Sequence, residues 1–438
     1  MADLAITRLN SQDADFDARF AQLVTWDAGD MAQIEKTVAD IIADVRAHGD
    51  AAVADYTQRF DKIDVHALGL EFTEADIDAA IAEVPPAELE ALKEAAERIR
   101  AYHQWQLPQL GNHEFRDAAG AMLGQRVAPL QRAGLYVPGG RASYPSSVLM
   151  NAIPAKVAGV EELIMAVPTP NGEVNPLILA AARIAGVDRA FRMGGAQAVA
   201  AMAYGTQSVP GVDKIVGPGN IYVAMAKRQV FGQVGIDMIA GPSEILVVAD
   251  NQNDPRWIAA DLLSQAEHDP DAQSILITDD ADFADRVEAA IEAHLLSLSR
   301  TEICLQSLNE RGGVIIVPDL EEGARIASRV APEHLELAVA DPRALLPLIR
   351  NAGAIFLGRY TPEAVGDYVA GPNHVLPTNG TARFSNPLGV HDFITRTSLI
   401  DCSPEALRCI GPGASVLAAS EGLTAHQLSV DLRLREAD

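Results

Sequence analysis

The sequence predicts an α/β protein of two Rossmann-like domains with parallel-sheet cores, one inserted in the other, plus a helical N-terminal region and a C-terminal tail. Three observations support this prediction. From about residue 120, short apolar runs alternate with helical stretches, and glycine or proline bounds them. The alternation comes in two successive groups, and this strand-helix-strand order implies right-handed crossovers and parallel sheets. The first hundred residues show helical periodicity without a strand pattern of their own.

The N-terminal hundred residues are therefore expected to form helices after a short arm. Little periodicity marks the arm, and helix-start signals mark each helix that follows. A helix over residues 31–47 has Asp30 as its N-cap and Gly49 just past its end. A capping box of Thr73 and Asp76 begins a second helix. Pro86 begins a third helix, which runs to about Gln106.

Buried strands and crossover helices then follow in alternation. The expected strands are Leu135–Val137, Leu163–Val167, Ala190–Met193, Lys214–Val216, Glu244–Ala249, Ser274–Thr278, Val314–Val317 and Ala354–Leu357, with a further strand after His334. The expected helices are Ser147–Val160, Pro176–Ala185, Ala196–Ala203, Asn220–Phe231, Pro255–Glu267, Asp282–Leu298, Glu321–Ala331 and Pro342–Arg350.

The domain boundaries follow from this order. Because the N-terminal helices have no sheet of their own, we expect them to pack onto the second α/β group. The predicted division is an arm over residues 1–30, a first α/β domain over 31–132 and 243–385, an inserted α/β domain over 133–242, and a dimerisation tail over 386–438.

The charge balance excludes some partners. With 34 basic and 60 acidic residues the formal charge is −26, so the surface repels phosphate backbones and anionic lipids, and neither nucleic acid nor a membrane is expected as a partner. Residues 121–240 differ, because their 10 basic and 6 acidic side chains leave a balance of +4. That segment is the better place for an anionic small molecule.

The remaining composition predicts a soluble, cytoplasmic protein. The three cysteines, Cys304, Cys402 and Cys409, fit no disulfide framework or zinc ribbon, and we expect the last two to be ordinary buried thiols. The N-terminus shows no signal-peptide pattern, and no apolar stretch is long enough to span a bilayer.

Glycine-rich turns lie within the basic segment. Gly134–Gly140, Gly194–Gly195 and Gly217–Gly219 each follow an expected strand, where backbone amides can hold phosphate. Each turn alone can equally be a tight connection that needs glycine only for its backbone conformation. Three of them in the basic segment favour an anionic cofactor, for which a dinucleotide is usual in this architecture.

A possible metal site lies on one helix. Gln265 and His268 are three residues apart and share a face, so a carboxamide oxygen and an imidazole nitrogen can reach one Zn²⁺. Glutamine is an uncommon zinc ligand, and the spacing alone favours a solvated helix end with His268 near the negative end of the helix dipole.

Further polar groups lie at turns. Glu333 and His334 are adjacent where a helix joins a strand, and together they can divide proton transfers between them; an exposed polar loop explains them equally well.

Asp367 can complete a metal site and His374 can touch a substrate, although an Asx-type turn is the alternative. Glu421 and His426 lie in the tail, so a role for them requires the tail to fold over a cleft of this chain or of a partner.

These stretches together resemble the histidinol dehydrogenase family over nearly the whole chain. The stretches that carry the resemblance are GLYVPGG (134–140), GGAQAVAA (194–201), DKIVGPGN (213–220), DMIAGPSE (237–244), SQAEHD (264–269), APEHLEL (331–337), GDYVAGPNHVLPTNGTARFSNPLG (366–389) and EGLTAH (421–426).

The resemblance implies a zinc- and NAD-dependent enzyme that oxidises L-histidinol through L-histidinaldehyde to L-histidine, with one Zn²⁺ per subunit. It also implies a homodimer in which Glu421 and His426 reach the partner's site. Implied roles are acid/base catalysis for Glu333 and His334, zinc ligation for Gln265, His268, Asp367 and His426, substrate contacts for Ser243, Glu421, His334 and the zinc ligands, and NAD contacts for Tyr136, Gln197 and Asn220.

Two other functions stay open at this point. A related NAD-dependent dehydrogenase on the same scaffold can act on another small alcohol, such as a sulfonated diol. A zinc-stabilised binding protein without turnover can share the fold, but it does not need Glu333 and His334 side by side.

Overall fold

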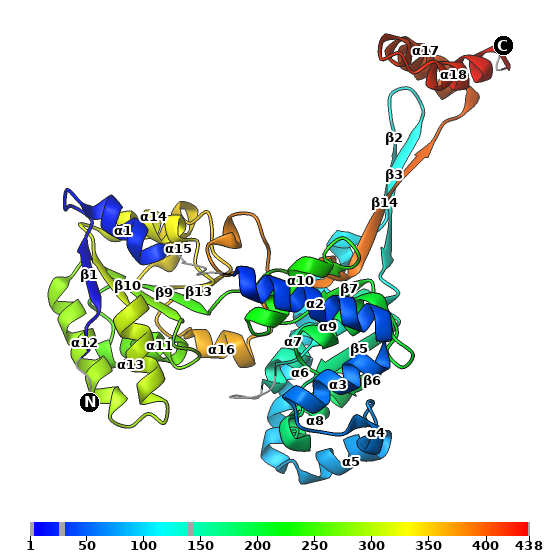
Figure 1. The fold of residues 1–438 in the computed structure, drawn as a ribbon. Helices are drawn as coiled ribbons and strands as arrows, with labels where there is room; N and C mark the ends of the chain where they lie inside the picture. The colour runs from blue at the N-terminus through cyan, green and yellow to red at the C-terminus, as the bar shows by residue number, and fades with distance from the viewer. Residues whose placement is uncertain (1–3, 26–30, 139–143, 437–438) are drawn as a thin grey trace.

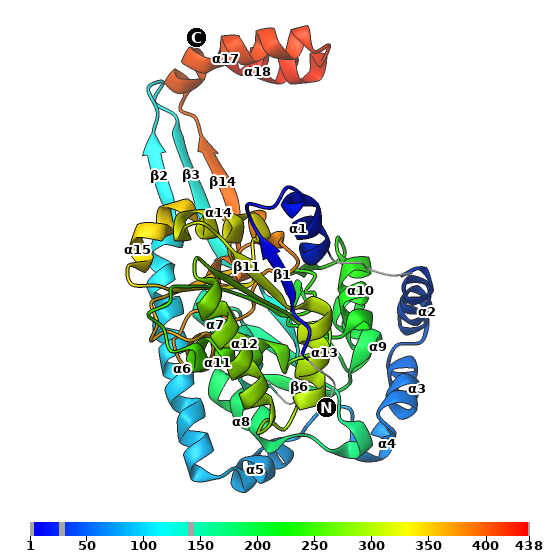
Figure 2. The same ribbon diagram turned by 90° about the vertical axis from the view of Figure 1, so that its left-hand side faces the viewer.

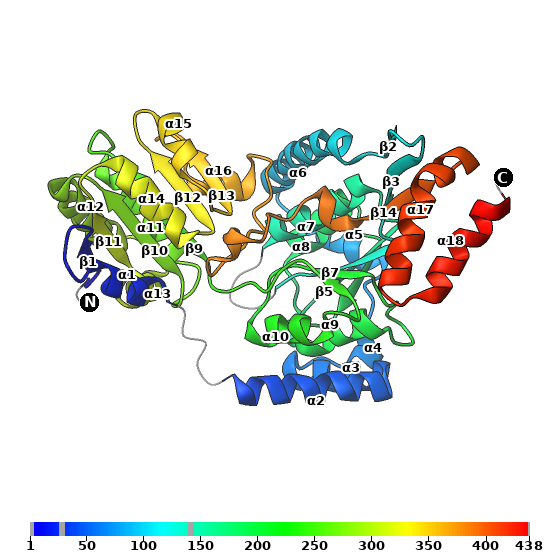
Figure 3. The same cartoon turned by 90° about the horizontal axis from the view of Figure 1, so that it is seen from above.

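The structure, a computed structural model, describes residues 4–25, 31–138 and 144–436. It confirms the α/β class, with two parallel sheets, each covered by helices on both faces, in two units that lie side by side (Figures 1 and 3). Burial on both faces explains why most strands are continuous apolar runs. Among the described residues, no helix combines the length and the apolar character needed to cross a bilayer.

The first sheet has six parallel strands in the order β1-β11-β10-β9-β12-β13. Its strands are β1 (Thr7–Asn10), β9 (Glu244–Ala249), β10 (Gln273–Thr278), β11 (Gly313–Ile316), β12 (His334–Ala338) and β13 (Ala354–Leu357). Helices α11 (Pro255–Ala266), α12 (Ala281–Leu295) and α13 (Thr301–Arg311) pack on one face, and α1 (Phe16–Val24), α14 (Leu320–Val330) and α15 (Pro342–Leu345) on the other.

The second sheet has five parallel strands in the order β6-β5-β4-β7-β8, all from the chain between β1 and β9. Its strands are β4 (Arg132–Tyr136), β5 (Glu162–Val167), β6 (Arg189–Arg192), β7 (Lys214–Val216) and β8 (Gly235–Ile236). Helices α7 (Pro145–Ala158) and α8 (Pro176–Ala185) pack on one face, and α9 (Gly195–Tyr204) and α10 (Ile221–Val230) on the other.

The sequence predicts that residues 31–132 pack with residues 243–385, but the structure places the N-terminal helices differently. Helix α2 packs on α9 and α10, α5 on α8, and α6 on α7, so this region covers the five-stranded sheet. The six-stranded sheet is already covered by its own helices, which leaves no apolar face for them. These N-terminal helices are α2 (Ala32–His48), α3 (Asp50–Phe60), α4 (Val65–Leu68), α5 (Glu74–Glu83) and α6 (Pro86–Gln106).

The N-terminal region contains an edge strand and the expected capping box. The described part of the expected arm is not free, because β1 forms the edge of the six-stranded sheet beside β11. The expected capping box is present, with Thr73 accepting from the Asp76 amide and Asp76 accepting from the Thr73 amide. Asp30 lies outside the described residues.

The C-terminal tail is ordered rather than loose. An antiparallel sheet of β14, β3 and β2 projects from the body, and a pair of packed helices, α17 and α18, stands at its tip (Figure 2). These strands have exposed or half-buried residues and show neither a continuous apolar run nor a regular alternation of polar and apolar residues, so their strand signal in the sequence is weak. The elements are β2 (His113–Arg116), β3 (Met122–Pro129), β14 (Ile394–Asp401), α17 (Pro404–Ser420) and α18 (Thr424–Glu436).

Short helical turns complete the chain. They are η1 (Leu107–Leu110), η2 (Pro170–Gly172), η3 (Leu346–Leu348), η4 (Thr381–Arg383) and η5 (Val390–Phe393), and one short helix, α16 (Glu363–Tyr368), lies between the two units (Figure 1).

A buried ion pair holds the glycine turn that follows β7. Lys227 pairs with Asp237, and their side chains are 3% and 1% exposed. Lys227 Nζ donates to the Gly217 carbonyl at 2.9 Å, and Asp237 Oδ2 accepts from the Gly217 amide at 2.7 Å. The pair therefore fixes both polar groups of this turn residue.

We predict that Lys227→Met lowers the free energy of unfolding by about 3–5 kcal/mol, because it leaves the Asp237 carboxylate buried without its cation. Lys93→Met is the control, since Lys93 pairs with Glu90 on the surface and its loss should cost less than about 1 kcal/mol. Urea denaturation of both variants checks this, and equal losses would contradict it.

Candidate active site

The candidate site lies at the amino ends of strands in the six-stranded sheet. Glu244 begins β9 and His334 begins β12, and the two strands are neighbours. Ligands in open α/β sheets usually bind at the carboxyl ends. At that end of this sheet the loop after β9 is bonded to the end of β12 and the chain that follows it, because Asp250 Oδ2 accepts from the Ala340 amide at 2.7 Å and Asn253 Nδ2 donates to the Ala338 carbonyl at 2.5 Å.

Glu333 and His334 are buried rather than in an exposed loop. Their exposed fractions are 7% and 3%. His334 Nδ1 lies 3.0 Å from the Glu244 carbonyl oxygen, which can only accept, so Nδ1 carries the hydrogen. His334 Nε2 has no hydrogen-bond partner among the described residues, and it faces Asp367 Oδ1 at 3.5 Å and Glu363 Oε1 at 3.9 Å.

Carboxyl groups outnumber cations around this imidazole. Burial raises the pKa of Glu333 to about 8, and burial together with the charge of Asp367 raises the pKa of Glu363 to about 8. Burial alone would lower the pKa of His334, but the surrounding carboxylates, Glu333 first, raise it to about 10. These raised pKa values keep protons on carboxyl groups that would ionise in water, and a bound cation would displace such protons.

The donor set fits a metal ion. His334, Glu363 and Asp367 offer ligand atoms that all lie within 4.8 Å of one another. Gln265 is fully buried, yet neither its Oε1 nor its Nε2 has a hydrogen-bond partner among the described residues. A buried polar group without a partner is costly, so these atoms point to a ligand.

The structure brings three of the four expected zinc ligands to this region. Gln265 lies on α11, His268 just beyond its end, and Asp367 on α16, which contacts α11. Burial lowers the pKa of His268, and the charge of Asp367 acts against that shift. Nitrogen and oxygen donors of this kind are those that Zn²⁺ accepts.

The expected NAD contacts lie at the carboxyl edge of the five-stranded sheet. Tyr136 ends β4, and its buried hydroxyl, whose pKa burial raises to about 12, accepts from the Gly195 amide at 3.0 Å. Gln197 is buried in the first turn of α9 with no partner for its Oε1 among the described residues. Asn220 is the N-cap of α10.

The backbone of the turn after β7 has no room for a side chain. Gly217 has φ +110°, and a Cβ there would lie 2.1 Å from the Tyr136 carbonyl oxygen. The packing of this turn against β4 explains the glycine at 217, so only the unpartnered Gln197 Oε1 points to a ligand here. Gly139 and Gly140 of the first glycine turn lie outside the described residues.

The other expected residues are not all at the site. Ser243 directly precedes Glu244, and His374 is held between the Asp367 carbonyl, at 2.9 Å, and Ser147 Oγ of the second unit, at 3.4 Å. Glu421 is the C-cap of α17 and His426 lies in α18, and both are exposed; Figure 1 shows these two helices at the tip of the arm, away from the two α/β units. Cys402 and Cys409 are also exposed, so the expectation that they are buried is wrong.

Sequence reasoning missed several buried acids. Glu244 and Glu363 line the site, and Glu336 lies behind it, with its Oε1 accepting from the Glu363 amide at 2.6 Å. The signal was available, because alternate residues of a strand share a face and Glu336 therefore lies on the side of His334. An acid within a buried apolar strand needs a partner there.

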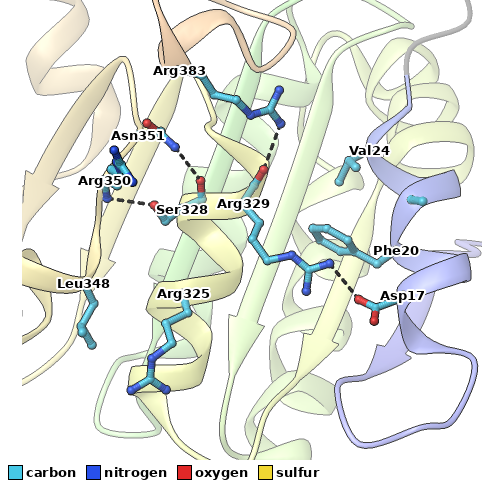
Figure 4. Close-up of a pocket in the computed structure, with 11 residues that line it drawn as sticks. Asp17, Phe20, Val24, Arg325, Ser328, Arg329, Leu348, Arg350, Asn351 and Arg383 are labelled. Carbon is cyan, nitrogen blue, oxygen red and sulfur yellow. Dashed lines mark hydrogen bonds and ion pairs between the residues drawn. The ribbon is translucent and has the colours of Figure 1, made fainter.

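A separate pocket of about 640 Å³ lies between α1 and α14 and contains none of these residues (Figure 4). Its lining includes four arginines, of which Arg329 pairs with Asp17 at 2.8 Å and Arg383 donates to the Arg329 carbonyl. It is distinct from the candidate site.

Two parallel α/β units, with a buried acid/imidazole pair beside one of them, are the architecture of a two-domain α/β enzyme. The chain belongs to the histidinol dehydrogenase family, whose model matches residues 25–434.

Relatives agree over the full length. A histidinol dehydrogenase of Pseudomonas aeruginosa is 60% identical over 434 residues, covering 99% of this chain and 98% of that protein. One of Rhodospirillum rubrum is 60% identical over 428 residues, covering 98% of each. The crystal structure of histidinol dehydrogenase from Elizabethkingia anophelis superposes with a TM-score of 0.93 at 34% identity, covering 100% of this chain and 99% of that one.

The unpartnered amide of Gln265 makes a prediction about stability. In metal-free protein, Gln265→Leu should raise the free energy of unfolding by about 1–3 kcal/mol, because it removes two buried polar atoms that have no partner. Gln273→Leu is the matched control, since Gln273 is equally buried but donates to the Leu23 and Arg311 carbonyls, and it should lower stability. Urea denaturation in chelator measures both, and a loss of stability in Gln265→Leu would refute the interpretation.

Proposed function

We propose that this chain oxidises L-histidinol through L-histidinaldehyde to L-histidine, using two NAD⁺ and one zinc ion per subunit. The observation that carries the proposal is the buried Glu333–His334 pair beside the unpartnered donors of Gln265, in a chain of this family. His334 Nε2 makes no hydrogen bond among the described residues and only faces the carboxylates of Asp367 and Glu363, so it is the ring nitrogen available to a substrate.

The cofactor sites follow from the same residues. Gln265, His268 and Asp367, with His426 of the partner subunit, would hold zinc, and Tyr136, Gln197 and Asn220 would hold NAD. When bound, zinc would orient the imidazole and amino groups of the substrate and NAD⁺ would accept hydride. Ser243 and Glu421 of the partner subunit would complete the substrate contacts.

The chain's own groups would move the protons. His334 is held through Nδ1, and with bound zinc offsetting the carboxylates that raise the pKa of His334, its Nε2 would be unprotonated and could take the hydroxyl proton of the alcohol in the first oxidation. Glu333 would take a proton from the water that hydrates the aldehyde, and His334, once it has released the first proton, would act again as base in the second oxidation. Burial of both groups keeps the reactive aldehyde away from bulk water between the steps.

The location of Glu421 and His426 supports a shared active site. Both are exposed at the tip of an arm that also exposes large apolar side chains, including Ile400, Val416 and Leu417. Such a surface is typical of an interface, and a second copy of the chain is the partner we propose. We also propose a cytoplasmic location, because all three cysteines are unpaired.

The catalytic roles predict a distinction between two variants. His334→Asn should lower kcat for both oxidations by about 100-fold or more, while Glu333→Gln should impair aldehyde oxidation more than alcohol oxidation. Steady-state NADH formation with L-histidinol and with L-histidinaldehyde measures this, and a panel of small diols, sulfonated ones included, tests the substrate. Near wild-type turnover of L-histidinol by both variants would contradict the assignment.

The shared site predicts complementation between inactive subunits. Asp367→Asn and His426→Ala dimers should each be inactive, but mixed subunits should regain about a quarter of wild-type activity, because half of the dimers then carry one intact site of two. Mixing His426→Ala with Glu421→Ala is the control and should restore nothing, since both changes lie on the same tail. No recovery in the first mixture would contradict the shared site.

A further inference from the structure

Glu244 and Glu333 form a reciprocal pair across two neighbouring strand starts. The Glu244 amide donates to Glu333 Oε2 at 2.9 Å, and the Glu333 amide donates to Glu244 Oε2 at 3.3 Å. Both residues are buried, with exposed fractions of 3% and 7%. Each carboxyl group is therefore held by the main chain of the other residue.

The second oxygen of Glu244 is also occupied. Glu244 Oε1 accepts from the Asn379 amide at 2.5 Å, so its two oxygens accept from main-chain donors of two different segments. An amide side chain has only one acceptor oxygen, and it cannot serve both donors. The main chain of Glu333 is fixed on its other side as well, because its carbonyl accepts from the Ala354 amide at 2.9 Å.

The two catalytic groups depend on different parts of Glu244. His334 Nδ1 is bonded to the Glu244 main-chain carbonyl, which a side-chain substitution leaves in place. The Glu333 amide is bonded to the Glu244 side chain. Glu333 Oε2 accepts from the Glu244 amide, and no hydrogen bond joins Glu333 Oε1 to a described residue, so one carboxyl oxygen is held and the other is left for a water molecule.

We propose that Glu244 is a positioning residue for Glu333: its carboxylate holds the Glu333 main chain so that the free carboxyl oxygen of Glu333 meets the water that hydrates the aldehyde. This inference rests on the proposed function, in which Glu333 activates that water. It assigns Glu244 to the second oxidation and not to the first.

Single-turnover NADH formation with limiting L-histidinol tests the proposal, because it separates the two oxidations. In Glu244→Gln the second oxidation should slow by about ten- to a hundredfold relative to the first. In the Glu333→Gln background, adding Glu244→Gln should cost nothing further, since Glu244 acts through Glu333. An unchanged ratio of the two steps, or losses that multiply in the double variant, would overturn the proposal.

Asp250→Asn is the matched control. Asp250 is a buried carboxylate at the other end of the same strand, and its oxygens likewise accept from main-chain amides, those of Gln252 and Ala340. Its loss should lower the melting temperature and leave the ratio of the two oxidations unchanged. A shift of that ratio in Asp250→Asn as large as in Glu244→Gln would also overturn the proposal, because the effect would then be a general one on the strand.

Two further measurements keep the result decisive. If Glu244→Gln does not fold, Glu244→Asp, which keeps the charge but is too short to reach both donors, carries the same expectation. If the wild-type protein makes no NADH from L-histidinol, the proposed function fails and a crystal structure of Glu244→Gln decides the positioning role. A displaced Glu333 carboxyl group would support it, and an unmoved one would refute it.

Discussion

The burial of several carboxyl groups around one imidazole, at the amino edge of the six-stranded sheet, is the constraint on which the rest of the structure depends. Burying carboxyl groups together costs free energy unless main-chain donors, a protonated imidazole or a cation offsets the lost solvation. The chain supplies part of that compensation through the reciprocal bonds of Glu244 and Glu333. The unpartnered atoms of Gln265 and His334 mark where the compensation is incomplete and a ligand is needed.

The two sheets contribute opposite edges to this arrangement. The six-stranded sheet carries Glu333 and His334 at its amino edge, while Asp250 and Asn253 bond to the chain at its carboxyl edge. The five-stranded sheet presents its carboxyl edge, where the turn at Gly217 is held by the buried pair of Lys227 and Asp237. Under the proposed function the dinucleotide would bind at the carboxyl edge of one unit and the acid/base pair would act at the amino edge of the other, and hydride transfer requires the two to meet.

Much of the fold follows from local sequence. Apolar runs bounded by glycine or proline located β9 and β13 to the residue, and capping signals located the starts of α5 and α6. Where the N-terminal helices pack was not predictable in this way. The amphipathic pattern of these helices shows that Val38 and Ile41 are buried but not which surface buries them. The projecting antiparallel sheet was not predictable either, because it lacks a core of its own. Likewise, spacing alone disfavoured Gln265 as a ligand, and only its buried, unpartnered amide in the folded chain indicates otherwise.

The central claim is that the cluster at the amino edge supports two successive oxidations of one bound substrate. The number of NADH molecules formed per L-histidinol tests it most directly, measured from NADH absorbance with limiting substrate, excess NAD⁺ and zinc-loaded wild-type protein. We expect two NADH per L-histidinol, with L-histidine as product. No NADH, or only one with release of the aldehyde, would contradict the account.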